Sequence, residues 1–328
     1  MRKLISTLLI ILFAGAINVN AQFNKAGRTA LQFLKIGIGA RQVGLGEACI
    51  ANINDINATF WNPAAITGIN DIEAGFTYTN WIADLNVMSG AIGINLHEYG
   101  ALGFSYVSLD YGEIPEAYVT SPTGGVDTRI GTTFGGGDLA VGFTYAKRFT
   151  DKLSIGMQVK YLREELYKYS TNLWAFDVGS YYETGWKGIR IAMSAQNFSS
   201  QARWLNTKEE EQQSYEIPII YRIGFSIDLM GGRDLILGGN PEDHKLSLNL
   251  DAIHSNDYAE RLNTGLEYTA FNFITFRTGY KINYDEGNFS IGFGAKYKEG
   301  PIDIKFDYAY VQYDFLESPH RFSIIMAF

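Results

Sequence analysis

The side chains that could carry catalysis or bind a metal ion are few and far apart in the sequence. The histidines, His97, His244, His254 and His320, have no spacing that would let them share a metal ion. His320 and Ser323 invite a hydrolase interpretation, but residues three apart in one strand point to opposite faces and cannot hydrogen-bond directly. Because a general base must reach the proton that it removes, we expect no catalytic residue, no metal and no enzymatic activity.

The sequence also argues against nucleotide cofactors and nucleic acids. There is no phosphate-binding P-loop, and Gly37 and Gly39 lack a further glycine at the dinucleotide spacing. The formal net charge of -8 offers no basic footprint for nucleic acid. Cys49 is the single cysteine and cannot form an intramolecular disulfide. The three glutamates at 209–211 are expected to form a solvated loop, with divalent-ion bridging as the weaker alternative.

The first residues have the pattern of a secretory signal peptide. Arg2 and Lys3 give a basic start, residues 4–16 are mainly apolar, and residues 19–21 offer a cleavage site after Ala21. A membrane anchor is the alternative, but the apolar core is short for a membrane span. No cysteine follows the site, so a lipoprotein is not expected. Residues 1–21 are therefore predicted to be an export signal.

Most of the remaining chain alternates with a period of two, which is the pattern of β-strands. The clearest run has Phe289, Ile291 and Phe293 on one face and Ser290 and Gly292 on the other. Fourteen candidate strands follow, with ends good to about two to four residues: 71–82, 86–97, 100–109, 138–149, 153–168, 173–185, 189–199, 216–229, 245–255, 260–271, 273–284, 288–298, 302–314 and 320–328. Most are long enough for a tilted strand to cross a bilayer.

Connection lengths alternate as well. Short turns follow every second strand, whereas the two longest connections, 110–137 and 199–215, belong to the opposite end. That asymmetry is typical of outer-membrane barrels, whose periplasmic turns are short and whose external loops are long. One connection breaks the rule, because 230–244 is long on the predicted periplasmic side.

The composition fits a membrane barrel. Aromatic residues make up 14% of the chain, yet the mean hydropathy is only -0.07 and, after residue 21, no apolar run is long enough for a membrane helix. A lipid-facing surface around a polar lumen gives this combination, and Phe328 closes an alternating strand at the end of the chain. A secreted soluble β-domain is the alternative.

Residues 27–70 do not alternate and are expected to form a plug. Residues 26–36 have helical spacing, and several glycines, including Gly39 and Gly46, suit close backbone packing. A barrel of this size has a lumen too wide for its own side chains to fill. Arg41 is expected to pair with a lumen carboxylate: Asp177, Asp251 or Glu267. A disordered periplasmic tail is the alternative. The predicted fold is all-β, a 14-stranded antiparallel transmembrane β-barrel (71–328) with an N-terminal, partly helical plug or hatch (22–70) in the lumen.

The plug carries a family resemblance. Three stretches, 33–41 (FLKIGIGAR), 44–48 (GLGEA) and 61–64 (WNPA), together with Asp55, resemble the N-terminal signature of PorV/PorQ-family outer-membrane proteins. Residues 80–84, 266–268, 277–281 and 320–323 resemble later family segments, so the resemblance covers nearly all of the predicted mature chain. The family is similar in architecture to FadL-type fatty-acid transporters, including a hatch matched here by Asn62, Pro63 and Ala64. The resemblance implies that the plug or hatch is formed by Gly39, Arg41, Gly46, Asp55, Trp61, Asn62, Pro63 and Ala64.

The resemblance implies a role in type IX secretion. A plugged barrel in the outer membrane of a Gram-negative bacterium would bind exported cargo or secretion and attachment partners, and the barrel itself would be a monomer within a complex. We expect loops 110–137 and 199–215 to carry the contacts, since Ile114, Tyr118, Val119 and Phe134 would be costly to leave exposed.

A second hypothesis follows from the hatch. A FadL-like barrel would pass a hydrophobic small molecule, and it predicts an apolar pocket near the plug and uptake that fails when Asn62 or Pro63 is altered. Genome context separates the two, because secretion components near the gene favour the first and hydrocarbon degradation genes the second.

Overall fold

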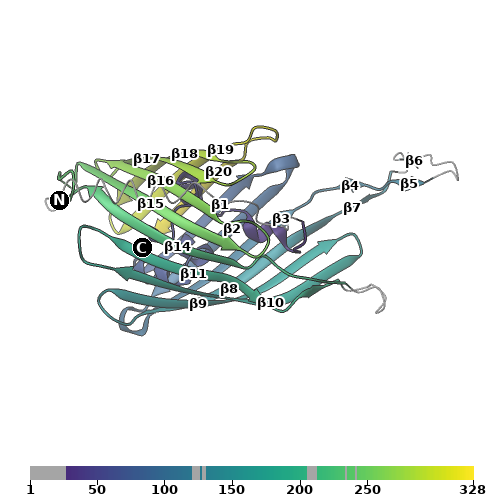
Figure 1. The fold of residues 1–328 in the computed structure, drawn as a ribbon, viewed down its shortest axis with the longest axis horizontal. Coiled ribbons are helices and arrows are strands. Elements are labelled where there is room, and N and C mark those ends of the chain that lie inside the picture. Colours follow the sequence, from purple (N-terminus) through teal and green to yellow (C-terminus); the bar gives the residue numbers. More distant parts are fainter. Residues whose placement is uncertain (1–26, 120–125, 128–130, 205–212, 233–234, 241) are drawn as a thin grey trace.

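The chain folds into one closed barrel (Figure 1). The computed structural model describes residues 27–328 except 120–125, 128–130, 205–212, 233–234 and 241, so the predicted signal peptide lies outside the described residues. The wall consists of fourteen antiparallel strands: β1(Ile72–Asn80), β2(Asn86–Asn95), β3(Ala101–Asp110), β8(Gly136–Arg148), β9(Leu153–Leu166), β10(Tyr169–Glu183), β11(Arg190–Ser199), β14(Ile220–Met230), β15(His244–Ser255), β16(Arg261–Ala270), β17(Ile274–Ile282), β18(Phe289–Glu299), β19(Ile302–Gln312) and β20(His320–Ala327). β1 pairs with β20 and closes the ring.

The number and order of the predicted wall strands are confirmed. The largest differences lie at two strand starts, since β10 begins at Tyr169 rather than 173 and β14 at Ile220 rather than 216. Both differences lie at the end with the longer loops. Two-residue strands inside the loops had no alternating signal and were not predicted.

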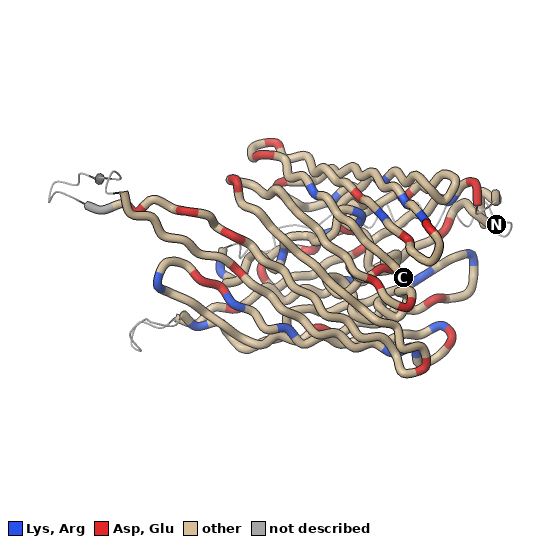
Figure 2. Tube along the Cα trace, turned by 180° about the vertical axis from the view of Figure 1, so that it is seen from behind, with Lys and Arg blue, Asp and Glu red and all other residues tan. Residues whose placement is uncertain are grey.

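The two faces of the wall differ as the alternation requires. Ile92, Phe104 and Phe143 are register neighbours on β2, β3 and β8, and their side chains are 52%, 47% and 55% exposed on the outer surface. Ser105 and Thr144, one position away, are buried in the lumen. Figure 2 shows long uncharged stretches along the strands, with many charged positions at turns and loops. Among the described residues, no helix is long and apolar enough to cross a membrane.

The two ends of the barrel carry different connections, which we call the turn end and the loop end. The turn end holds mainly short connections, including η5(His97–Tyr99), and also the long 230–244 connection. The loop end holds η4(Ile82–Asp84), the ribbon β12(Ala202–Arg203) with β13(Ser214–Tyr215), and the segment between β3 and β8. That segment forms an arm from β4(Ile114–Pro115), β5(Tyr118–Val119), β6(Val126–Asp127) and β7(Thr133–Phe134), which projects beyond the wall (Figure 1).

The segment before β1 lies inside the barrel as a plug. It contains η1(Gln32–Lys35), α2(Ala40–Gly44), η2(Ile56–Phe60) and η3(Pro63–Gly68). The continuous helix expected from the spacing of 26–36 is wrong, since within the described residues 27–36 only the 3-10 turn η1 forms. Ala30 N–H donates to the carbonyl of Glu216, Leu31 N–H donates to Glu164, and Leu31 has φ 53°. These wall contacts prevent a continuous helix.

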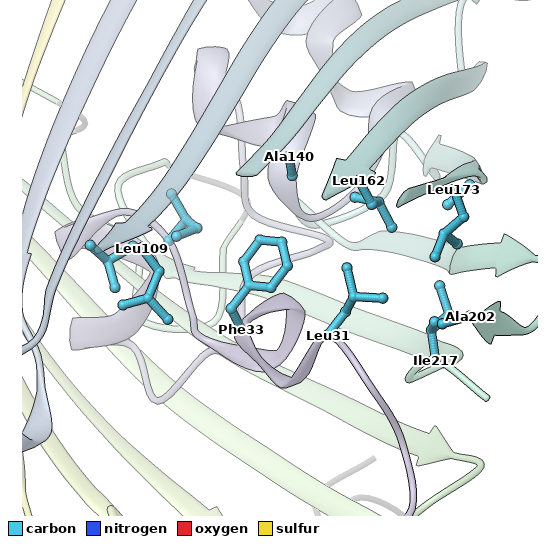
Figure 3. Packing of buried hydrophobic residues seen from close by; sticks show 11 residues of the cluster. Leu31, Phe33, Leu109, Ala140, Leu162, Leu173, Ala202 and Ile217 are labelled. Atoms are coloured by element: carbon cyan, nitrogen blue, oxygen red, sulfur yellow. The ribbon is translucent and has the colours of Figure 1, made fainter. Parts of the chain in front are cut away.

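The apolar core lies between the plug and the wall. Leu31 and Phe33 of the plug pack with Leu109, Ala140 and Leu162 of the wall (Figure 3). Fully burying side chains of this size contributes about 1.5–3 kcal/mol each. The inward wall residues at this place are therefore apolar where the apolar side chains of the plug pack against them.

Candidate functional site

The hatch residues sit on a glycine pair of the wall. Gly156 of β9 and Gly179 of β10 are register partners. A Cβ at Gly179 would lie 2.0 Å from Asn62 Oδ1, and a Cβ at Gly156 would lie 2.5 Å from the backbone nitrogen of Ala64. We call Gly156 and Gly179 the hatch seat. The missing side chain lets the plug backbone approach Gly156 and the buried Asn62 side chain approach Gly179.

A second glycine pair holds the turn after α2. Gly265 of β16 and Gly279 of β17 are also register partners. A Cβ at Gly279 would lie 2.0 Å from the nitrogen of Gly46, and one at Gly265 would lie 2.4 Å from the carbonyl oxygen of Leu45. We call Gly265 and Gly279 the turn seat. Gly46 has φ 64°, which explains the glycine on the plug side.

Asn62 and Pro63 build the start of η3 at the hatch seat. Asn62 Oδ1 accepts the N–H of Ala64 at 3.1 Å, and Pro63 takes the first helical turn, where its missing N–H costs nothing. Asn62 Nδ2 donates to the carbonyl of Ser180 on β10 at 3.1 Å. Asn62 is fully buried, so its amide serves the helix and the wall together.

Arg41 joins the plug to the wall through a chain of charges. Its Nε and Nη2 donate to the two carboxylate oxygens of Glu267 at 2.9 and 3.0 Å, and Nη1 donates to Asp55 at 3.0 Å. Burial alone would lower the pKa of Arg41, but Glu267 and Asp55 outweigh it and raise the pKa well above its usual range. Gly39, at φ 89°, precedes α2 and lets the chain turn into the helix that carries Arg41.

Arg41 was expected to pair with one of three lumen carboxylates, and this prediction is confirmed. Glu267 is the partner, whereas Asp177 pairs with Lys160 at 2.8 Å and Asp251 accepts the N–H of Cys49 at 2.8 Å. All three carboxylates do face the plug or lumen, as the alternation indicated.

The charge chain continues into wall residues that the sequence analysis missed. Arg277 donates to Glu267 at 2.7 Å and to Asp307 at 2.6 Å. The order of charges is therefore Asp55, Arg41, Glu267, Arg277, Asp307. The period of two places Arg277 and Asp307 on inward faces, and that signal could have found them.

Trp61 and Glu47 complete the plug contacts. Trp61 Nε1 donates to the carbonyl of Ile38 at 2.8 Å, and its ring lies 5.1 Å from the guanidinium of Arg222. Glu47 accepts from Lys281 at 3.2 Å. Burial would raise the pKa of Glu47, but the positive charges of Lys281, Arg222 and Arg321 outweigh it and lower the pKa.

The arm carries the predicted loop residues on two short antiparallel strand pairs, β4 with β7 and β5 with β6. Ile114 and Phe134 are register partners and half-buried, and the Phe134 ring contacts Tyr167 edge-on with centroids 5.4 Å apart. Tyr118 and Val119 pair with Asp127 and Val126 farther along the arm. The glutamates at 209–211 lie outside the described residues.

Cavities lie on both sides of the plug. A chamber of about 620 Å³ lies at the loop end, and a polar funnel of about 590 Å³ around Arg41 lies at the turn end. Between plug and wall lies a smaller cavity of about 60 Å³, lined by Phe33, Phe60, Trp61 and polar wall residues. Among the described residues, no group of three or more His, Cys, Asp or Glu could hold a metal ion.

His320 and Ser323 are separated as predicted. Ser323 is buried and hydrogen-bonds to Thr77 and to the N–H of Ala40. His320 contacts Tyr308, whose hydroxyl lies 2.8 Å from Nδ1. The two side chains therefore belong to separate contacts, one with the plug and one with a neighbouring strand.

Solved structures of hydrocarbon channels share this architecture. The CymD monoaromatic hydrocarbon channel is 13% identical, with a TM-score of 0.57 over 89% of this chain and 98% of that one. The Pseudomonas putida toluene transporter TodX is 10% identical, with a TM-score of 0.54 over 88% of this chain and 97% of that one. At these identities the likeness concerns the fold, and it agrees with the expected FadL-like architecture.

No curated protein sequence matches the chain. The family model described as type IX secretion system protein PorV matches residues 19–202, which include the whole plug, both glycines of the hatch seat and the arm. Together with the closed barrel, this match places the protein in the outer membrane of a Gram-negative bacterium. The chain belongs to the PorV family of type IX secretion system proteins.

Proposed function

We propose that the protein binds exported cargo or attachment partners of type IX secretion at its loop end. The observation that carries the proposal is the arm between β3 and β8, which projects beyond the wall while the plug fills the lumen below it. A filled lumen suits a binding protein better than an open pore. We also propose that the chain consists of a signal peptide (1–21), a plug (22–70) and a barrel (71–328).

The arm has the features of a docking element. Its base is fixed, because Glu116 N–H donates to the carbonyl of Thr132 at 3.0 Å and Tyr167 N–H donates to the carbonyl of Gly135 at 3.1 Å. Ile114 and Phe134 place apolar side chains on this base. A partner that covers these side chains would remove apolar surface from water, at about 25 cal/mol per Å².

Deleting the arm tests the proposal. Because β3 ends at Asp110 and β8 begins at Gly136, removal of 112–135 spares every wall strand. We expect normal membrane insertion, measured as heat-modifiable gel mobility, and loss of co-purified secretion partners identified by mass spectrometry. Undiminished partner recovery from the deletion variant would contradict the proposal.

Point substitutions in the arm test the same proposal against a matched control. Ile114→Asp and Phe134→Asp should each reduce partner recovery several-fold. Ile236→Asp introduces the same charge at an exposed position of the long 230–244 connection, at the turn end, and should leave recovery unchanged.

The fold likeness supports a second candidate, a transporter of hydrophobic small molecules. CymD and TodX are hydrocarbon channels by their descriptions. The small cavity beside Trp61 has an apolar plug side, but its 60 Å³ is well below the roughly 300–1,000 Å³ of ligand pockets. Transport therefore requires the plug to shift from its seats.

Uptake assays distinguish the two candidates. Asn62→Ala removes the η3 cap and the bond to Ser180, and Pro63→Ala removes the first-turn proline. If the protein is a transporter, cells that carry these variants should differ from wild-type cells in their uptake of radiolabelled toluene. A protein that only binds partners should show the same uptake as cells without the gene.

A further inference from the structure

The loop-end chamber contains a basic cluster that partner binding at the arm does not use. Arg222 of β14, Lys281 of β17 and Arg321 of β20 line the chamber together with Glu47 of the plug. Their exposed fractions are 8%, 7% and 2%, so the three cations are almost withdrawn from water. Three strands, well separated around the barrel, and the plug thus bring four charged groups to the lining of one chamber.

The positive charge of this cluster exceeds its negative charge. Lys281 Nζ lies 3.2 Å from Glu47, but no described carboxylate lies within 4.0 Å of the guanidinium of Arg222 or Arg321. Glu47 interacts electrostatically with all three cations, and the buried Asp251 of β15 interacts with Arg222. Three cations thus face two carboxylates, which leaves an excess of one positive charge. Buried charge without a partner is costly, so this arrangement favours a bound anion.

The two unpaired arginines are fixed but not satisfied. Arg321 Nε donates to the carbonyl of Gly37 at 3.2 Å, and its guanidinium lies 5.1 Å from the centre of the Trp81 ring. Arg222 donates to Gln196 through Nη1 and lies over the Trp61 ring. Arg321 Nη1 and Arg222 Nε are buried and have no hydrogen-bond partner among the described residues. Each guanidinium thus has one unsatisfied N–H that protein atoms cover, while the small exposed part of the side chain lines the chamber.

The other carboxylates that line the chamber do not serve as partners of the cluster. Asp138 accepts the hydroxyl of Tyr111 at 2.8 Å, and Glu164 accepts the N–H of Leu31 at 2.7 Å. Glu286 accepts the N–H of Asp314 at 2.8 Å. These groups stabilise the plug entry and the loops.

We propose that the chamber binds a small dianionic solute, through a phosphate group or a pair of carboxylates, held by Arg222, Lys281 and Arg321. Guanidinium groups match such oxyanions with paired hydrogen bonds. The 620 Å³ volume fits a small organic ligand. Arg261, held between the rings of Tyr258 and Tyr284 at 3.9 and 4.1 Å, adds a further cation to the chamber. The site is independent of the function proposed for the arm.

Binding measurements on the purified full-length protein in detergent test this site. The probes are sodium phosphate and sodium succinate at pH 8, with sodium acetate as the monoanion, all at constant ionic strength. Titration is followed by calorimetry and by tryptophan fluorescence, since Trp61 and Trp81 contact the two arginines. We expect at least one dianion to bind at least tenfold more tightly than acetate. Tighter phosphate binding assigns a phosphate-bearing ligand, and tighter succinate binding assigns a dicarboxylate.

Substitutions locate the binding. Arg321→Gln and Arg222→Gln should each weaken dianion binding at least tenfold, which is about 1.4 kcal/mol, because each removes hydrogen bonds from a charged group. Arg148→Gln, an exposed position at the turn end, should bind as the wild type does. If a buried variant fails to show heat-modifiable mobility, Arg261→Gln is used and should weaken binding several-fold.

Two results would overturn the proposal. One is equal binding of phosphate, succinate and acetate to the wild type, which would mean only general charge attraction. The other is unchanged dianion affinity in folded Arg222→Gln and Arg321→Gln proteins, which would place the anion elsewhere.

Discussion

Single residues attach the plug through groups that satisfy two elements at once. Arg41 links Asp55 of the plug to Glu267 of the wall, and Asn62 caps η3 while it bonds to β10. Both residues are largely buried, so neither can exchange its partner for water without cost. Their side chains therefore hold the plug in one position within the lumen.

Replacing Arg41 should destabilise the folded protein. Arg41→Met leaves Asp55 and Glu267 short of a partner, and breaking a buried ion pair costs about 3–5 kcal/mol. Urea unfolding in detergent measures the free energy of unfolding of the wild type and of the variant. Arg163→Met, which breaks the exposed pair with Glu165, should change it by at most about 1 kcal/mol.

A double substitution separates the ion pair from general damage. If Arg41 acts through Glu267, then Arg41→Met with Glu267→Gln should cost less than the sum of the two single changes. Additive costs would mean that the two residues act independently.

At the scale of elements, paired glycines on neighbouring strands determine where the plug touches the wall. The hatch seat receives the start of η3, and the turn seat receives the turn after α2. Each seat spans two strands at one register level, so the backbone of the plug lies directly on the sheet.

Filling a seat should displace the plug. Gly179→Ala and Gly279→Ala each put a methyl group 2.0 Å from a plug atom, and such overpacking costs about 1–3 kcal/mol. Limited trypsin digestion should then cut at Lys35 or Arg41, which the native plug protects. Gly68→Ala meets no atom closer than 3.7 Å and serves as the control. Protection equal to wild type in both seat variants would refute the role of the seats.

The sequence predicted the wall far better than the contacts inside it. Alternation is a local pattern, because each wall residue faces either lipid or lumen, so Phe104 and Ser105 could be assigned at once. Contacts between distant segments have no such pattern, and the pairing of Gly156 with Gly179 depends on the register of two strands. Local helical spacing around Leu31 was overruled by hydrogen bonds to Glu164 and Glu216. For Arg41 three carboxylates were candidate partners, and only the fold selects Glu267.

At the scale of the whole molecule, plug and barrel are joined by buried charges, so their union depends on pH. The pKa of Glu47 is lowered by Lys281, Arg222 and Arg321. A group whose folded-state pKa is lowered contributes stability above its ordinary pKa of 4.5 and loses it as the pH falls through the folded value. Acid should therefore weaken the hold of the barrel on the plug.

Acidification from pH 7 to 3 measures this contribution. The free energy of unfolding should fall below pH 4.5, and the fall should be smaller in Glu47→Gln, which has no proton to bind at this position. An identical pH profile for wild type and Glu47→Gln would show that Glu47 does not contribute. Glu98→Gln, at an exposed position of the turn end, is the control.

The seam between β1 and β20 has a consequence for the order of assembly. The hydroxyls of Thr77 and Ser323 lie 2.7 Å apart across it, although 246 residues separate them in the chain. Contacts between residues this far apart in the chain form late in folding. The entropic cost of closing the loop comes before the contact can stabilise the fold. The plug precedes β1 and lies against glycine seats with no clearance for sliding. We therefore expect the nascent wall to wrap around a plug already in place, so that residues 27–70 serve as the core on which the cylinder is built.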